Sequence, residues 1–204
     1  MTTGGEGGML TTNEDSVWER ARSFRDHGAK HSTDGNGKNS HPFQWIHDSF
    51  GTNWRLTEMQ SAIGRAQLLK VRQWAALRRR NAAILTDRLA DCSALRVTVP
   101  PPEIGHSYYK YYVFVRRDYL RASTNRNQIM ASIRAEGVPC FSGICGEIYL
   151  EKAFPKELRP LEPKKVAREL GETSLMFLVH PTLAEQDMMD TCYAIEKVMA
   201  LAMK

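Results

Sequence analysis

The sequence predicts an α/β protein in which an incomplete N-terminal unit is followed by a compact α+β unit. From residue 95 onward, extended and helical patterns alternate in the order β-β-α-β-α-β-α. Residues 57–91 contain no proline and one glycine, which favours a long helical region. Residues 1–50 contain one helical pattern and too few extended residues to bury a sheet. We therefore expect three parts, which are residues 1–56 as the remnant of a larger domain, 57–94 as a linking helical region and 95–204 as a small domain.

The composition is that of a soluble globular chain. Of 204 residues, 42% are apolar and 25% are charged, and no apolar run reaches the length of about 20 residues that spans a bilayer. The first ten residues have neither a basic segment nor an apolar one, so we expect a cytoplasmic protein without a membrane partner. The net charge of +5 does not by itself indicate nucleic acid. Four cysteines without a CxxC pair predict reduced thiols and no metal site.

The N-terminal part predicts few elements. The glycine-rich segment Gly4–Gly8 is typical of a turn, and it lacks the Lys-Ser or Lys-Thr that would follow in a phosphate loop. A short strand is expected over 9–12. A helix that Asn13 or Asp15 caps then runs to about His27, and a long irregular loop follows over 29–50.

The helical region begins with a clear signal. Thr57 and Gln60 have the spacing of a capping box, and the region is expected to be broken once. An apolar stripe follows one face of its first part: Leu56, Met59, Ile63 and Ala66. The basic run 78–80 is typical of a solvated helix face.

The C-terminal part predicts strands and helices in alternation. Strands are expected over 95–99, 107–117 and 174–179, with a further extended piece beginning at Val138. Helices are expected over 127–137, where Gly137 ends the helix, over one or two short stretches within 146–170, and over 182–204.

Two short segments carry candidate binding residues. Asn53 and Arg55 precede a helix N-terminus, where an amide donor and a guanidinium can bind a phosphate or a carboxylate. The same spacing is equally compatible with local capping and a surface ion pair. His106 and Tyr109, with neighbouring tyrosines, can line a polar pocket, although alternating aromatic residues in a strand are more often core.

Several motifs in this order resemble the pyridoxal-phosphate-dependent sugar aminotransferases, the DegT/DnrJ/StrS group. They are TTGGEGGMLTTN (2–13), DHG (26–28), FGTNWRLTEMQSAIGRAQL (50–68), HSYYKYYVF (106–114), GVPCFSG (137–143) and SLMFLVHPTL (174–183). The resemblance covers nearly the whole chain and implies the C-terminal portion of the aspartate aminotransferase-like fold. It also implies a homodimer that transfers an amino group, usually from glutamate, to a keto group of a nucleotide-linked sugar, for polysaccharide or antibiotic biosynthesis.

The resemblance also implies what this chain lacks. In the family, the lysine that forms the Schiff base lies just upstream of the TTGGEGG-like segment, and this sequence starts at that segment. Lys30, Lys38 and Lys110 do not occupy the motif position. We therefore expect a truncated form that has no catalytic lysine, binds no pyridoxal phosphate alone and is inactive alone.

Four positions carry over from the family. Asn53 matches an asparagine that reaches the cofactor phosphate of the partner subunit, and Arg55 matches an arginine near substrate or cofactor anions. His106 and Tyr109 match the region beside the sugar, although a histidine is common at the position of Tyr109. Two other functions stay open, namely a pseudoenzyme or dimerisation module and, less favoured, a nucleic-acid-binding domain that uses the arginine-rich helix.

Overall fold

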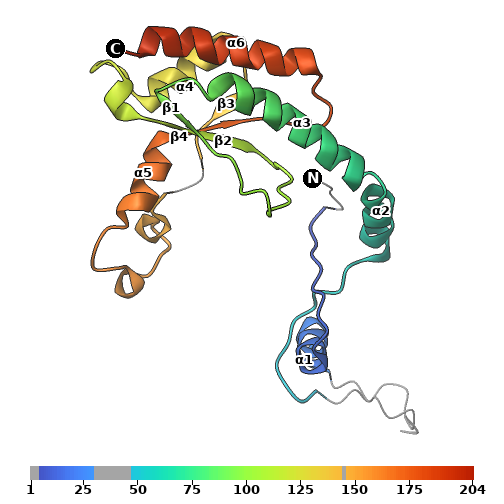
Figure 1. Ribbon diagram of the computed structural model, residues 1–204. Helices are drawn as coiled ribbons and strands as arrows, with labels where there is room; N and C mark the ends of the chain where they lie inside the picture. The colour runs from blue at the N-terminus through green and yellow to red at the C-terminus, as the bar shows by residue number, and fades with distance from the viewer. Residues whose placement is uncertain (1–4, 30–46, 144–145) are drawn as a thin grey trace, which may run out of the picture. The chain divides into compact units, whose positions relative to one another are not determined.

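A computed structural model describes residues 5–29, 47–143 and 146–204, which form two compact units (Figure 1). Unit 1 comprises residues 1–71 and unit 2 comprises residues 72–204. The start of the glycine-rich segment and most of the loop expected over 29–50 lie outside the described residues. The three-part division into 1–56, 57–94 and 95–204 concerns domains of the whole protein and stays a prediction.

Unit 1 contains two helices, α1 (Asp15–Arg25) and α2 (Glu58–Leu68). The prediction of α1 is confirmed, but its N-cap residue is Glu14, which makes no side-chain cap bond, in place of Asn13 or Asp15. The strand expected over 9–12 is not formed, because these residues pair with no other strand in the described part of the chain. An isolated extended segment leaves its backbone groups to water and gains no ladder.

The apolar side chains of unit 1 are almost all exposed. Gly28 is the only buried residue that the structure describes in this unit. The stripe expected to form an apolar face of α2 is among the exposed residues, since Leu56, Met59 and Ile63 are 44%, 77% and 46% exposed. Its period is helical as predicted, but nothing in the described residues of the unit covers it. Unit 1 therefore has helices without a core of its own.

Unit 2 is built on a four-stranded antiparallel sheet in the order β1-β2-β4-β3. Its register places Val97 beside Val113, and Val113 beside Leu175. The strands are β1 (Leu95–Val97), β2 (Tyr111–Val115), β3 (Cys140–Phe141) and β4 (Ser174–Phe177). The helices are α3 (Val71–Leu89), α4 (Arg126–Ala135), α5 (Lys165–Thr173) and α6 (Glu185–Ala202), with short 3-10 turns η1 (Arg117–Tyr119), η2 (Ile148–Leu150) and η3 (Lys156–Leu158).

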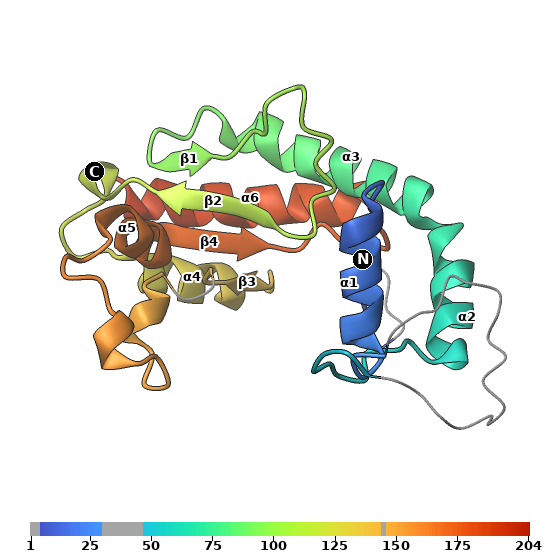
Figure 2. The ribbon, with the colours of Figure 1, turned by 90° about the horizontal axis from the view of Figure 1, so that it is seen from below.

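Helices α3, α4 and α6 cover one face of the sheet, and α5 lies on the other side (Figures 1 and 2). Alternate strand residues point into the helical layer, so that Tyr111, Val113 and Val115 are buried while Tyr112 and Phe114 between them are only half-buried. All four residues of β4 are buried, as expected of a central strand. The predicted alternation of elements from residue 95 onward is thus confirmed, with shorter strands than expected.

The predicted helical region is broken once, between Leu68 and Val71, as expected. The prediction of a solvated basic face over 78–80 is wrong for Arg78, which is 3% exposed. Its guanidinium tolerates burial because loop carbonyls accept its hydrogen bonds. None of the helices in the described ranges is long and apolar enough to cross a membrane.

Candidate functional site

The segment that carries Asn53 and Arg55 is held by backbone hydrogen bonds to the end of α1. The Thr52 amide donates to the Phe24 carbonyl at 2.7 Å, and the Trp54 amide donates to the Arg25 carbonyl at 2.9 Å. Asn53 forms an isolated antiparallel bridge with Asp26. This ladder brings together two motifs, 26–28 and 50–56, that are separated by more than twenty residues in sequence.

A glycine turn makes this close pairing possible. His27 and Gly28 both have positive φ, at 59° and 81°, so the chain reverses in the left-handed region. A Cβ atom on Gly28 would lie 1.7 Å from the Ser49 carbonyl oxygen, and one on Gly51 would lie 2.3 Å from the Gly28 nitrogen. Both positions therefore require glycine, which gives a physical reason for DHG and for the glycine of FGTN.

The side chains of Asn53, Arg55 and Asp26 form one cluster. The Arg55 Nε donates to the Asn53 Oδ1 at 3.1 Å and lies 3.5 Å from the Asp26 Oδ1. The Arg55 side chain is 53% exposed. The Asn53 amide oxygen accepts the bond from Arg55, and its amide nitrogen is a further hydrogen-bond donor. The cluster thus offers an amide and a guanidinium to an anion, with Asp26 offsetting part of the positive charge.

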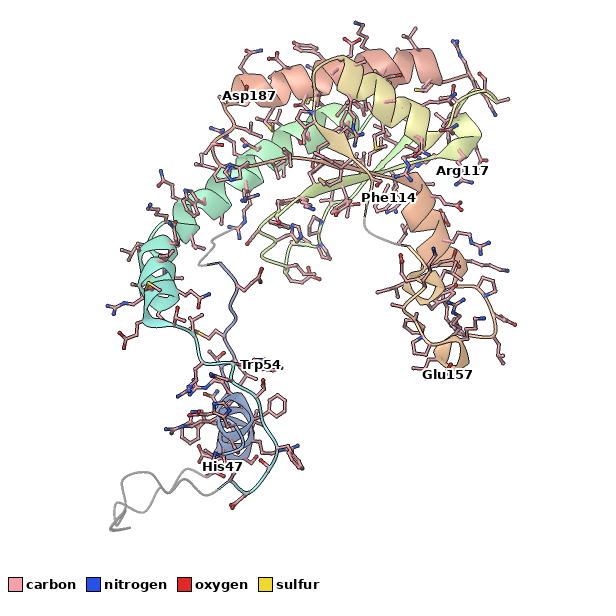
Figure 3. The ribbon with its side chains drawn as sticks, turned by 180° about the vertical axis from the view of Figure 1, so that it is seen from behind. His47, Trp54, Phe114, Arg117, Glu157 and Asp187 are labelled. Atoms are coloured by element: carbon pink, nitrogen blue, oxygen red, sulfur yellow. The ribbon has the colours of Figure 1, made fainter. Side chains whose placement is uncertain are left out.

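The N-terminus of α2 is already capped by its own side chains. The Thr57 Oγ1 accepts from the Gln60 amide at 3.2 Å, and the Gln60 Oε1 accepts from the Thr57 amide at 3.3 Å, so the predicted capping box is confirmed. The Gln60 Nε2 also donates to the Glu6 carbonyl at 2.9 Å, which ties the glycine-rich segment to α2. Because this box caps the helix, Asn53 does not serve as its cap. Trp54, which is labelled in Figure 3, packs edge-on against Phe24 with ring centroids 5.2 Å apart.

His106 and Tyr109 lie in the loop that precedes β2, although the strand expected over 107–117 included Tyr109. The His106 ring meets the Tyr108 ring edge-on at 4.4 Å, and its Nδ1 accepts from the Tyr108 amide at 3.2 Å. Tyr108 stacks near Tyr111 and has a φ of 43°. The Tyr109 ring is 64% exposed, with the Lys110 Nζ 5.4 Å from its centroid. The loop therefore turns one aromatic residue inward and presents the next one outward.

The loop rests on helix α3 through two residues that the sequence analysis assigned to a solvated face. The Arg78 Nη1 donates to the carbonyls of Tyr108 and Tyr109 at 3.2 and 3.0 Å. The Arg79 Nε donates to the His106 carbonyl at 2.9 Å. Sequence reasoning missed this support, since a run of three arginines on a helix gives no sign of which one points inward.

The two candidate pairs lie in different units, Asn53 and Arg55 in unit 1 and His106 and Tyr109 in unit 2. A hydrogen bond joins Asn53 and Arg55, whereas His106 contacts Tyr108 and the Tyr109 ring is exposed. None of the four lines either of two clefts in the described residues, one of about 810 Å³ between α1 and residues 48–50 and one of about 620 Å³ beside the N-terminus of α4.

The three cysteines that the structure describes are poor candidates for a nucleophile. Burial raises the pKa of Cys140 and that of Cys192 to about 11, and it also raises the pKa of Cys92. These thiols stay protonated at neutral pH, and a protonated thiol is a poor nucleophile. Within the described ranges, no three His, Cys, Asp or Glu side chains gather as metal ligands would.

Residues 1–196 match the DegT/DnrJ/EryC1/StrS aminotransferase family. The chain is 29% identical to the GDP-perosamine synthase of Caulobacter vibrioides over 98% of its own length and 50% of that protein. It is 45% identical to an aminotransferase of Psychrobacter cryohalolentis whose X-ray structure matches 99% of this chain, and 53% of that one, with a TM-score of 0.88.

A second similar structure holds a cofactor. The Escherichia coli GDP-4-keto-6-deoxy-D-mannose-3-dehydratase, solved with bound hydrated PLP, matches 91% of this chain and 49% of that one, with a TM-score of 0.74 at 20% identity, and so shares the fold. The chain spans about half the length of the curated relatives it matches.

Proposed function

This chain belongs to the DegT/DnrJ/EryC1/StrS aminotransferase family, and from that premise we propose that it is part of a pyridoxal-phosphate-dependent aminotransferase. The proposed reaction moves an amino group from glutamate to a keto group of a nucleotide-linked sugar, in the biosynthesis of amino sugars for polysaccharides in the cytoplasm. The observation that carries this proposal is the family match over residues 1–196, supported by the name of a relative that makes a nucleotide-linked amino sugar.

The donor set around Asn53 fits the phosphate of the cofactor. The Asn53 amide nitrogen and the half-exposed Arg55 guanidinium are neutral and charged donors, both of which suit a phosphate oxygen. Pyridoxal phosphate, when bound, supplies an electron sink for the chemistry at the amino-bearing carbon. Asn53 would bind its phosphate across a subunit interface, and the backbone ladder to Asp26 would keep the amide in place.

The remaining residues would bind substrate. Arg55 would contact a carboxylate or a sugar-linked phosphate through its outer nitrogens. The exposed Tyr109 ring and the His106 side chain would border the sugar, with the tyrosine hydroxyl as a hydrogen-bonding group. Within the chain, no group of this set is placed to act as the covalent nucleophile, which we assign to a lysine outside these residues.

A homodimer follows from the same proposal, because Asn53 would act on the partner's cofactor. The apolar surface of unit 1 supports a large contact area there. Phe50 and Leu69 are 100% and 87% exposed, and further apolar side chains are exposed nearby in sequence: Trp54, Leu56, Met59, Ile63 and Leu68. Exposed apolar area of this kind usually marks a surface that another protein segment covers.

The test compares this chain with a version preceded by the lysine-bearing segment, read from the genomic DNA upstream of Met1. We expect the 204-residue chain to give no absorbance band of a protein-linked cofactor after addition of pyridoxal phosphate, and no turnover of glutamate with a keto-sugar nucleotide. The extended version should show both. Turnover by the 204-residue chain at rates ordinary for such enzymes would contradict the assignment of the nucleophile. An extended version that binds the cofactor but transfers nothing would favour a pseudoenzyme.

A further inference from the structure

A buried arginine lies beneath the loop that carries His106 and Tyr109. Arg78 is 3% exposed, although it belongs to a run of three arginines on α3 whose other two members are exposed. Burial of a guanidinium is costly unless strong acceptors surround it. Its acceptors here are the main-chain carbonyls of Tyr108 and Tyr109, so the charge is directed at the backbone of the loop.

Helix α3 contacts this loop at two levels along one face. Arg78 and its neighbour Arg79 donate hydrogen bonds to three backbone carbonyls of the loop, those of His106, Tyr108 and Tyr109. Two turns later, the Thr86 hydroxyl bonds the Tyr111 hydroxyl at 2.9 Å, where the strand begins. Residues eight apart on a helix lie on the same face, so the helix follows the loop into β2.

The loop needs such support because it has no strand to pair with. Its regular pairing begins only at Tyr111, and Tyr108 has a positive φ, which a tyrosine adopts only when its surroundings impose it. The bond from Arg78 to the Tyr108 carbonyl acts on the strained residue itself. Without it, the backbone of Tyr108 is free to relax to a negative φ and move the residues on both sides.

One buried donor of the Arg78 guanidinium also makes no hydrogen bond within the described residues, and packing alone does not explain this. Its Nε is buried and has no hydrogen-bond partner among the described residues. A buried donor without a partner destabilises a fold, and an apolar side chain of similar volume at such a position is often neutral or stabilising. Burial lowers the pKa of Arg78, an effect that the Tyr109 phenol partly opposes, yet an arginine stays charged at neutral pH.

We propose that Arg78 and Arg79 are positioning residues that fix the backbone of residues 106–109 and so present His106 and Tyr109 to the sugar substrate. Neither arginine touches the substrate in this arrangement, and each acts through the loop carbonyls. The statement that this loop binds the sugar rests on the proposed function. The statement that the two arginines fix the loop backbone rests on their hydrogen bonds alone.

The first experiment measures amide hydrogen exchange of the full 204-residue chain, comparing residues 104–110 with β2 and β4. Arg79→Met is the main variant because Arg79 is exposed and its loss leaves the core of unit 2 intact. We expect exchange in 104–110 to rise about tenfold, the effect of one lost charge-assisted bond, with no change in the strands. Arg79→Lys should restore part of the protection, since a lysine also donates to a carbonyl. Arg88→Met is the matched control, because Arg88 is on α3 but bonds Glu196.

The variant Arg78→Met removes the two bonds to Tyr108 and Tyr109 and should accelerate exchange of the loop more than Arg79→Met does. If both variants leave exchange in 104–110 unchanged, the arginines do not hold the loop and the proposal is wrong. It is also wrong if strands and loop accelerate equally, because the arginines then only stabilise the fold. Should Arg78→Met fail to fold, Arg79→Met and its lysine variant decide alone.

The second experiment uses the lysine-bearing version that tests the proposed function. Arg79→Met should raise the KM for the nucleotide-linked sugar about tenfold and change kcat less than about twofold, as expected when ground-state binding weakens. If instead kcat falls about tenfold and the KM is unchanged, the two arginines do not act by presenting the loop to the substrate. If that version has no activity, the proposed function fails, whereas the exchange result still decides whether the arginines hold the loop.

Discussion

At the scale of single residues, Asn53 and Arg55 are neighbours with different expected roles. The Asn53 amide is fixed by Arg55 and by the backbone ladder, whereas the outer nitrogens of Arg55 are exposed. In the lysine-bearing version, Asn53→Ala should weaken retention of pyridoxal phosphate by about 1–3 kcal/mol, the value of a hydrogen bond to a charged group. Equilibrium dialysis of the cofactor measures this, with the exposed Asn13→Ala as control. Retention equal to that of the parent would make Asn53 a structural residue.

Arg55→Ala in the same version separates the two roles. We expect its effect to fall on the KM for glutamate or for the nucleotide-linked sugar more than on cofactor retention, since the Arg55 side chain is 53% exposed and a guanidinium binds carboxylates and phosphates. A loss of cofactor as large as that of Asn53→Ala would assign both residues to the phosphate.

Gly28 is the third residue with a definite prediction. Gly28→Ala adds a Cβ that would overlap the Ser49 carbonyl, at a φ of 81° that alanine avoids. We expect it to break the hydrogen bonds of residues 52–54 to the end of α1, and to increase amide exchange there at least tenfold. Gly8→Ala is the matched control, because a Cβ on Gly8 meets nothing within 4 Å. Unchanged protection in the Gly28 variant would mean that the turn tolerates rearrangement.

At the scale of elements, the joint between α3 and β2 predicts a dependence of stability on alkaline pH. Burial raises the pKa of Tyr111 to about 12, with the Thr86 bond acting against it. Between about pH 10, where an unfolded tyrosine ionises, and pH 12, the unfolded chain releases a proton that the folded chain keeps. The free energy of unfolding should therefore fall as the pH rises through this interval.

The variant Tyr111→Phe tests this joint by urea unfolding. At pH 7 it should be less stable than the parent by about 1 kcal/mol, the value of the lost bond to Thr86. The difference should shrink above pH 10, since phenylalanine does not ionise. Tyr119→Phe, at an exposed position, should match the parent at every pH. A difference for Tyr111→Phe that stays constant from pH 7 to 11 would contradict the raised pKa.

At the scale of the whole molecule, the two units differ in how they are stabilised. Unit 2 contains all the buried apolar side chains of the described residues, among them Leu85, Tyr111, Phe177 and Ile195. Of the residues of unit 1 that the structure describes, only Gly28 is buried. Burial of apolar area is the main stabilising contribution to a fold, so the two units should differ strongly in stability.

We expect a chain of residues 72–204 to unfold cooperatively in urea with nearly the free energy of the whole chain. A chain of residues 1–71 should show little helix by circular dichroism, because isolated helices of this length are marginal in water. Cooperative unfolding of residues 1–71 alone would contradict this expectation. So would a fragment 72–204 that does not fold.

Local signals in the sequence determined much of this protein. The capping box of Thr57 and Gln60, the end of α4 at Gly137 and the single break near residue 70 depend on contacts within a few residues, and all of them are present. The motifs also led to the family, which the match over residues 1–196 confirms. The motifs place Asn53 near Arg55 in the sequence, but they predict no contact of either residue with Asp26. That contact forms because the backbone ladder across the glycine turn brings Asp26 beside them.

The tertiary structure alone decided which side chains are buried and what they contact. The period of Leu56, Met59 and Ile63 marks a helical face, but burial requires a partner surface, and the described residues of unit 1 provide none. Likewise, three consecutive arginines are equivalent in the sequence. Only the packing of α3 against the loop before β2 turns Arg78 inward toward two carbonyls and leaves its neighbours in solvent. Periodicity follows from the geometry of one helix, whereas burial depends on elements that lie far away in the chain.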